Sequence, residues 1–153
     1  MLTIAILLAI HIVSVVFWVG GMAFAYTILR PAAGPMEAPV RLAMWARVFA
    51  RFLPWVGVSA AALLITGFAM IFMLFGGMAT TPIYVHLMLG LGIVMMLIYL
   101  HLVFAPFKRL RAAVERGAFP EAGKALHQIR LLVGINLIIG TITVIVGGTG
   151  RYW

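Results

Sequence analysis

Two histidines inside apolar segments are the residues best placed in this sequence to hold a metal-containing cofactor. His11 lies 19 residues before Arg30 (30 − 11). His86 lies 20 residues before Pro106 (106 − 86). If Arg30 and Pro106 end two helices at the same membrane face, a rise of ~1.5 Å per residue brings both imidazoles to nearly the same height. Cofactors of helical bundles are held by side chains from facing helices. We therefore predict that His11 and His86 together ligate a b-type haem.

The residues beside these histidines fit a large, flat ligand. Gly90 lies one turn from His86 on the same helical stripe and leaves room for such a ligand. His11 is followed on its own stripe by Ser14 and Trp18. We therefore include Gly90 and Trp18 among the predicted cofactor-binding residues.

His101 is a candidate for a second redox site. It follows His86 by 15 residues (101 − 86), which is ~22 Å along a helix, and the two share a broad face. Its candidate partner is His127. The alternative is that His101 hydrogen-bonds a backbone carbonyl or a lipid headgroup, and that His127, close to Arg130, is a solvated residue. Since the depths of His101 and His127 do not match, we favour one haem over two.

The ten methionines suggest a different chemistry, because thioether ligands suit Cu(I). Met70 and Met73 lie one helical turn apart, and Met88 and Met95 lie two turns apart on the segment that carries His86. Copper bound by His and Met is therefore the alternative to haem. Ordinary packing explains a methionine stripe as well, and we favour it.

The remaining reactive side chains exclude several enzyme classes. There is no cysteine, no Ser-His-Asp set and no phosphate-binding loop, and the three acids, Glu37, Glu115 and Glu121, lie outside the apolar segments. Arg47 and Arg51, spaced i, i+4, would suit an anion such as a propionate or a quinone carbonyl. We favour their interpretation as anchors at the membrane surface.

Four apolar segments must position these side chains. They cover residues 2–29, 53–75, 83–107 and 127–149. About 20 apolar residues cross the ~30 Å hydrocarbon core of a bilayer. We therefore predict an all-α, integral membrane four-helix bundle, a single domain over residues 1–153 with the lipid bilayer as its surroundings. The first segment lacks preceding basic residues and is longer than the apolar part of a signal peptide, so we expect a retained helix.

The basic residues predict how the chain crosses the membrane. The first connection holds Arg30, Arg41, Arg47 and Arg51, and the third holds Lys108, Arg109, Arg111, Arg116, Lys124 and Arg130. The N-terminus and the second connection have none, and the tail has only Arg151. The positive-inside rule places the first and third connections in the cytoplasm and both termini outside, in a bacterial inner membrane. The net charge of +8 is thereby explained by topology and lipid, without a nucleic-acid partner.

Two further patterns concern the packing of the helices. Trp45 and Trp55 are predicted to mark the inner membrane interface, and Tyr84, Tyr152 and Trp153 the outer one. On the fourth segment, Asn136, Gly140, Thr143 and Gly147 form a small and polar stripe. Such a stripe predicts close helix packing with an interhelical hydrogen bond.

Several motifs resemble the copper-resistance D (CopD) family. They are His11, Trp18-Val19-Gly20-Gly21-Met22, Leu29-Arg30-Pro31-Ala32, Arg51-Phe52, Leu64 to Gly67, Tyr84-Val85-His86-Leu87-Met88, His101 to Pro106 and Gln128-Ile129-Arg130. The first segment also resembles the HemJ-type protoporphyrinogen oxidases, a related four-helix group that binds b haem. That resemblance implies His11 as a haem ligand. The chain has Met88 where that group has a lysine, and Gly134-Ile135-Asn136 where it has Asn-Glu-Pro, so we do not expect protoporphyrinogen oxidation.

These observations lead to three functional hypotheses. The first is a membrane redox protein in which b haem serves electron transfer or oxidation, with quinol as a candidate partner and a homo-oligomer as the expected assembly. It would make the chain a candidate membrane haem oxidoreductase. The second is a copper transport or resistance protein that uses His and Met ligands. The third is a structural subunit without a cofactor.

Overall fold

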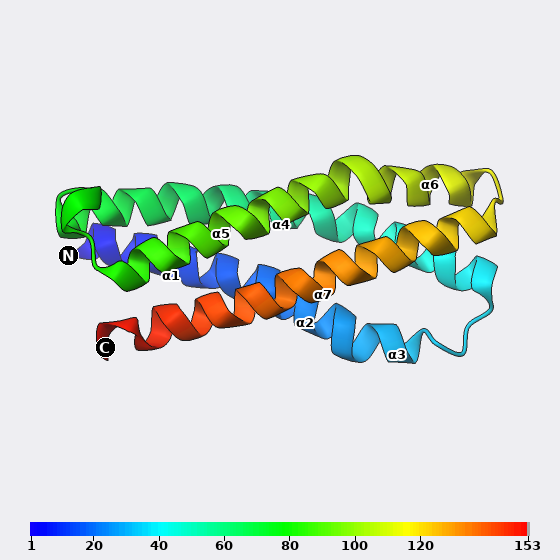
Figure 1. Ribbon diagram of the computed structural model, residues 1–153, viewed down its shortest axis with the longest axis horizontal. Helices are drawn as coiled ribbons and strands as arrows, with labels where there is room; N and C mark the ends of the chain where they lie inside the picture. Colours follow the sequence, from blue (N-terminus) through cyan, green and yellow to red (C-terminus); the bar gives the residue numbers. More distant parts are fainter. Residues whose placement is uncertain (153) are drawn as a thin grey trace.

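The protein consists of four long helices. The computed structural model describes residues 1–152, a range that contains no β-strand (Figure 1). The helices cover Leu2–Ala32, Ala38–Phe75, Ile83–Glu115 and Phe119–Tyr152, and each is long and apolar enough to cross a membrane. The predicted all-α membrane bundle is therefore confirmed. Trp153, one of the predicted outer anchors, lies outside the described residues.

Three of the four helices change geometry along their length. The first comprises α1 (Leu2–Val15), α2 (Gly21–Phe24) and α3 (Arg30–Ala32), joined by the π-helical segments η1 (Val16–Gly20) and η2 (Ala25–Leu29). The second is α4 (Ala38–Phe75), and the connection after it contains the 3-10 turn η3 (Met78–Thr80). The third joins α5 (Ile83–Leu102) to α6 (Lys108–Glu115) through the π-helical η4 (Val103–Phe107), and the fourth is α7 (Phe119–Thr149) with the 3-10 turn η5 (Gly150–Tyr152). Pro106 lies within η4, where a widened turn accommodates a residue that has no N–H to donate.

Glycines end the helices at two of the turns. Gly76 caps α4 with φ 73°, and Gly117 follows α6 with φ 70°. Both are left-handed conformations that glycine adopts without a steric penalty. The connection between α4 and α5 is therefore short, and Gly117 separates α6 from α7. The first connection is shorter than the apolar pattern indicates, because α4 begins at Ala38 and already carries the arginines Arg41, Arg47 and Arg51.

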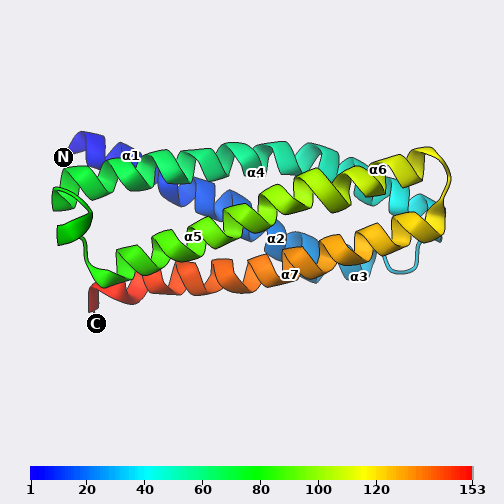
Figure 2. The same ribbon diagram turned by 45° about the horizontal axis from the view of Figure 1, so that its top comes forward.

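The helices are paired and antiparallel. α1 packs along α4, and α5 and α6 pack along α7. Both chain termini and the α4–α5 connection lie at one end, here called the terminal end (Figures 1 and 2). The α3–α4 and α6–α7 connections lie at the other, here called the basic end. The helices are 31 to 38 residues long. At ~1.5 Å per residue they measure ~45–57 Å, longer than the ~30 Å hydrocarbon core, so they extend beyond it.

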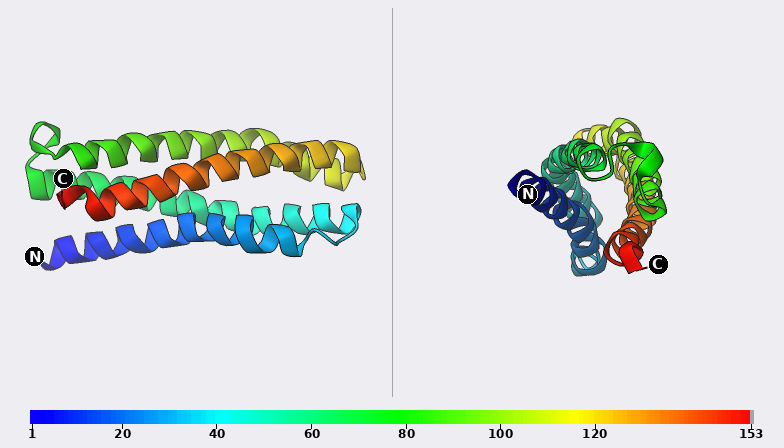
Figure 3. Two further views of the ribbon diagram at one scale, coloured as in Figure 1. Left: turned by 60° about the horizontal axis from the view of Figure 1, so that its bottom comes forward. Right: turned by 90° about the vertical axis from the view of Figure 1, so that its left-hand side faces the viewer.

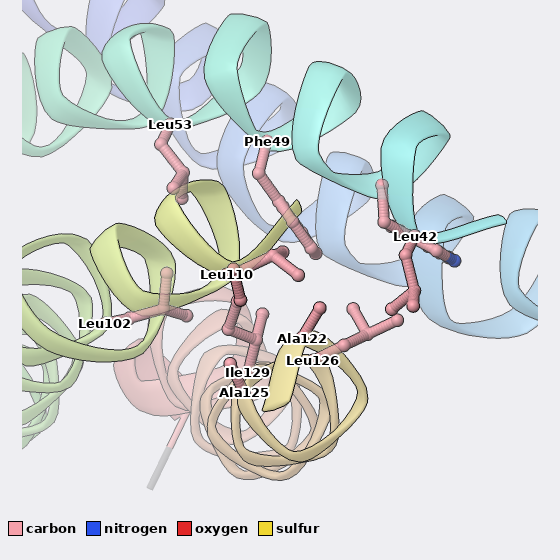
Figure 4. Packing of buried hydrophobic residues seen from close by; sticks show 11 residues of the cluster. Leu42, Phe49, Leu53, Leu102, Leu110, Ala122, Ala125, Leu126 and Ile129 are labelled. Carbon is pink, nitrogen blue, oxygen red and sulfur yellow. The ribbon is translucent and has the colours of Figure 1, made fainter. Parts of the chain in front are cut away.

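The main apolar core lies at the basic end. It is a cluster of eleven buried residues: Leu42, Trp45, Phe49, Leu53, Leu102, Leu110, Ala113, Ala122, Ala125, Leu126 and Ile129. Figure 4 shows side chains from α4, α6 and α7 pointing toward one another around Leu110, which is 0% exposed. Trp45, predicted as an interfacial anchor, is instead 2% exposed and stacks on Phe49. That prediction is wrong because Trp45 lies on the inward face of α4, whereas Trp55 is exposed.

A second, smaller cluster occupies the middle of the bundle. It contains Trp18, Met22, Val56, Ala60 and Met95. The predicted stripe on α7 packs here, since a Cβ at Gly140 would lie 3.0 Å from the Met95 Cε and 3.1 Å from a Val19 methyl. Asn136 donates a hydrogen bond from Nδ2 to the Met95 carbonyl, at 3.3 Å. Close packing with an interhelical hydrogen bond is therefore confirmed.

Candidate cofactor cavity

A cavity of about 550 Å³ lies between the helices toward the terminal end. Its walls come from α1 and η1, from the second half of α4, from α5 and from the last third of α7. Figure 3 shows the four helices in side and end views, with α1 and the end of α7 on separate flanks of the bundle. The lining is mostly apolar and includes the imidazole of His11.

The hydrogen bonds around His11 fix its tautomer. His11 Nδ1 lies 2.8 Å from Thr66 Oγ1, which is on α4 and buried. The Thr66 hydroxyl donates its proton to the Ala62 carbonyl at 2.6 Å. Because that hydroxyl has one proton, it can only accept from His11, so Nδ1 carries the hydrogen. Nε2 is then the nitrogen with a free lone pair. Histidines that ligate metals usually donate the other ring N–H in this way.

Two residues near His11, Gly67 and Trp18, form part of the cavity wall. A Cβ built on Gly67 would lie 3.5 Å from the His11 Cε1, an ordinary van der Waals contact, so the ring packs beside this position of α4. Trp18, which is 2% exposed, also lines the cavity, about two helical turns after His11. From α7, the cavity is lined by three glycines and two β-branched residues: Gly140, Gly147 and Gly148, with Thr143 and Val144.

Four methionines share this cavity with His11. They are Met70 on α4 and Met88, Met95 and Met96 on α5. Met88 packs against α7, where a Cβ at Gly147 would lie 3.1 Å from its sulfur. Of the pairs predicted from spacing, Met88 and Met95 both line the cavity, whereas Met73 is exposed and does not. The cavity therefore combines one imidazole with several soft sulfur ligands.

Comparison with models of protein families identifies the family of this chain. The family model of CopD, described as copper resistance protein D, matches residues 46–149. The chain belongs to the CopD family. No curated protein and no solved structure matches the chain. The matched region runs from α4 to the end of α7 and contains His86 and His101, whereas His11 precedes it. The case for His11 therefore rests on the cavity and its hydrogen bonds.

His86 lies in the same end of this CopD-family bundle but does not line the cavity. Its neighbours Val85, Met88 and Leu89 do. His86 donates from Nδ1 to the Pro82 carbonyl one turn earlier, at 3.2 Å, since a carbonyl can only accept. Its Nε2 thus also keeps a free lone pair. Gly90, one turn along the same stripe, is exposed and absent from the lining. Matching depth places the two histidines at one level but does not fix the direction in which each faces.

The other predicted site residues lie apart from the cavity. His101 and His127 are both exposed, on α5 and α7 respectively, and so are Arg47 and Arg51 on α4. Within residues 1–152, no three His, Asp or Glu side chains come close enough to form a metal site.

Thr66 is a residue that sequence reasoning missed. Thr66 is buried, and it lies 55 residues after His11 in the chain, on the neighbouring helix. Its hydrogen bond orients the imidazole of His11. A signal was present, because Thr66 belongs to the apolar motif from Leu64 to Gly67 and is its one polar residue. A hydroxyl in an apolar span needs a partner, and His11 is the polar group on the neighbouring helix at that depth.

Proposed function

We propose that this CopD-family protein is a membrane redox protein that binds b haem in the cavity, with His11 as an axial ligand through Nε2. The observation that carries the proposal is the hydrogen bond from His11 Nδ1 to Thr66 in the wall of an apolar cavity. It holds the imidazole in one tautomer with a ligand nitrogen free.

The residues of the cavity fit a haem by size and by chemistry. Cofactor pockets measure roughly 300–1,000 Å³ and are mostly apolar with a few placed polar groups. The cavity, at about 550 Å³, falls within that range. His11 would bind the iron, Thr66 would keep the imidazole oriented, and Trp18 and the methionines would exclude water. A haem bound here would supply one-electron transfer within the apolar part of the bundle.

His86 remains our proposed second axial ligand, and its test is spectroscopic. Its depth and its free Nε2 support the assignment, while its outward stripe requires a turn of the side chain or of the first turn of α5. Ligation by both histidines gives a low-spin, six-coordinate spectrum. A five-coordinate, high-spin spectrum that is unchanged in His86→Ala would exclude His86. A second haem at His101 is tested by the ratio of haem to polypeptide, which we expect to be near one.

Copper binding is the second candidate, and the four cavity methionines favour it. Thioethers suit Cu(I), and Met70 and Met88 line the cavity together with His11. In this case copper is the cargo of a transport or resistance protein. The purified protein would then be free of haem and would bind Cu(I) in a manner that depends on these methionines.

We further propose a bacterial inner membrane as the location, with the terminal end and the cavity toward the outside. The basic residues concentrated at the opposite end support this orientation. A quinol substrate and a homo-oligomeric assembly belong to the same proposal. A cysteine introduced at Thr80, which is exposed in the α4–α5 connection, should react with a membrane-impermeant reagent in intact cells. Reaction only after permeabilisation would reverse the orientation.

The deciding experiment is the absorption spectrum of protein purified from cells supplied with both haem precursor and copper. We expect a Soret band, a pyridine haemochrome ratio near one, and loss of both in His11→Ala. His127→Ala is the matched control, because His127 is an exposed histidine at the basic end. A colourless wild-type protein with bound copper would replace the haem proposal with the copper one. A protein with neither would leave the structural-subunit hypothesis.

A further inference from the structure

Three arginines line a second pocket, at the basic end of the bundle. The pocket has a volume of about 510 Å³ and is lined by Tyr26, Arg30, Pro31, Gly34, Arg41 and Arg130. Its walls come from η2 and α3, from the α3–α4 connection, from the first turns of α4 and from α7. It shares no lining residue with the cofactor cavity.

Each arginine is held in place by a contact that leaves donors unused. Arg41 donates from Nη1 to the Gly34 carbonyl at 3.1 Å and to the Met36 carbonyl at 2.9 Å, so its Nε and Nη2 remain available. The Arg30 guanidinium lies 5.0 Å from the ring centre of Tyr26. The Arg130 guanidinium lies 5.9 Å from the ring centre of Trp45. Stacking on an aromatic ring fixes a guanidinium without consuming its N–H groups.

These positive charges have no acidic partner within residues 1–152. The ion pairs there join Arg111 to Glu115 and Arg116 to Glu121, and neither involves a pocket arginine. In addition, Arg130 Nε is buried without a hydrogen-bond partner. A buried donor left unpaired is unfavourable, and neighbouring like charges repel. An arrangement of this kind is stabilised when an anion enters the pocket.

We propose that the pocket of Arg30, Arg41 and Arg130 binds a phosphate group. Guanidinium groups match phosphate oxygens with paired, charge-assisted hydrogen bonds. Three cations favour a phosphate, which can carry more than one negative charge and offers several acceptor oxygens, over a single carboxylate. The pocket lies at the basic end of the bundle, where positively charged side chains flank the apolar segments. The phosphate comes either from the headgroup of an anionic phospholipid, which basic pockets between membrane helices bind, or from a soluble phosphate compound.

The two sources are distinguished by thermal unfolding of the protein in lipid nanodiscs. We compare phosphatidylglycerol with phosphatidylcholine, and in phosphatidylcholine we add millimolar inorganic phosphate or acetate at equal ionic strength. A higher unfolding temperature in phosphatidylglycerol alone assigns the site to a lipid headgroup. A higher temperature with phosphate, but not with acetate, assigns it to a soluble phosphate. If neither phosphatidylglycerol nor phosphate raises the unfolding temperature, the proposal is wrong.

Matched substitutions separate the pocket from the general positive charge of this end. Arg41→Gln and Arg130→Gln should each lose at least half of the gain in unfolding temperature. Arg47→Gln removes the same charge from an exposed position of α4 outside the pocket and should keep the gain. An equal loss in Arg47→Gln would show diffuse attraction and overturn the proposal.

A second measurement does not depend on removing a charge. Arg41→Lys and Arg130→Lys keep the charge but lose the planar group that pairs with phosphate. Native mass spectrometry should show the ratio of phospholipid-bound or phosphate-bound protein to free protein falling about fivefold in these variants. The same ratio should be unchanged in Arg47→Lys. Equal ratios in all three variants and the wild-type protein would contradict a built site.

Discussion

At the basic end, large side chains fill the space between α4, α6 and α7, and the arginine pocket lies beside this cluster. At the terminal end, the same bundle encloses a mostly apolar cavity. The difference is visible in the residues that face inward. Leu110, Leu126 and Ile129 are between 0% and 2% exposed at the basic end. The cavity at the terminal end is lined by large apolar side chains together with several glycines, among them Gly92 and Gly147. Close packing at one end and missing side chains at the other follow directly from residue size.

This comparison assigns stability and ligand binding to different ends of the molecule. A filled core resists change because the loss of each side chain leaves a void. A cavity lined by glycine and flexible methionine loses few contacts when its ligand leaves. We therefore infer that the basic end holds the four helices together, and that the terminal end can admit a cofactor at small cost to the fold.

The largest expected effect is on stability, from truncating leucine at the basic end. Leu110→Ala should lower the free energy of unfolding by about 2–5 kcal/mol, because it creates a cavity in a filled cluster. Leu74→Ala is the matched control, since Leu74 is 50% exposed and borders the cofactor cavity. It should cost less than about 1 kcal/mol. Unfolding in SDS, followed by circular dichroism, measures both. Equal losses would contradict the division between the two ends.

The next effect is on cofactor binding, from filling the cavity. Gly92 lines the cavity and Gly90 does not, although both lie on α5 with open space around a new Cβ. Gly92→Leu should reduce haem content about 5- to 150-fold, the equivalent of roughly 1–3 kcal/mol of overpacking. Gly90→Leu should leave haem content unchanged. The reverse pattern would place the haem on the predicted stripe of His86 and Gly90, outside this cavity.

A smaller effect is expected from the hydrogen bond that orients His11. Thr66→Val removes the hydroxyl while keeping the shape of the side chain, and should weaken haem binding about 10- to 100-fold. Thr66→Ser restores the hydroxyl and should recover most of the affinity. Haem titration of the apoprotein gives the affinity, and the reduction potential reports on the ligand. If Val and Ser bind haem equally well, Thr66 contributes packing only.

The fold was predictable because the length and hydropathy of the four apolar segments identify four membrane-spanning helices. The exact helix ends were less so, since helical geometry continues past the apolar segment into the charged turns of α4. Trp45 shows the same weakness, because position along the chain does not tell whether a tryptophan faces lipid or the neighbouring helices. It packs among the buried residues of the basic end.

Residue spacing gives a prediction for the depth of each histidine along its helix, but none for the direction in which its side chain faces. Spacing gave the depth of His11, and the structure adds the cavity and the bond to Thr66. For His86, depth was insufficient because the 100° step between residues turns its stripe away from that of Met88. The pocket of Arg30, Arg41 and Arg130 was not predictable from the sequence, because Arg41 and Arg130 are distant in the chain and come together only in the folded protein. The pair with helical spacing, Arg47 and Arg51, was the more visible pattern but is exposed.

The smallest expected effect is at Tyr99, where the two ends meet. Its ring packs against both the basic-end cluster and the smaller central cluster. Its hydroxyl donates a hydrogen bond to the Leu53 carbonyl, at 3.0 Å. A Cβ built on Gly57 would lie 2.6 Å from the same hydroxyl oxygen, so the glycine leaves room for it. Tyr99→Phe keeps the ring and removes only this hydrogen bond. Such bonds contribute about 0.6 kcal/mol on average in membrane proteins, so the free energy of unfolding in SDS should fall by that amount.

Haem content should not change in Tyr99→Phe, because Tyr99 does not line the cavity. A parallel loss of haem would mean that the two ends are coupled through this side chain, and the division between a stabilising end and a binding end would then have to be given up.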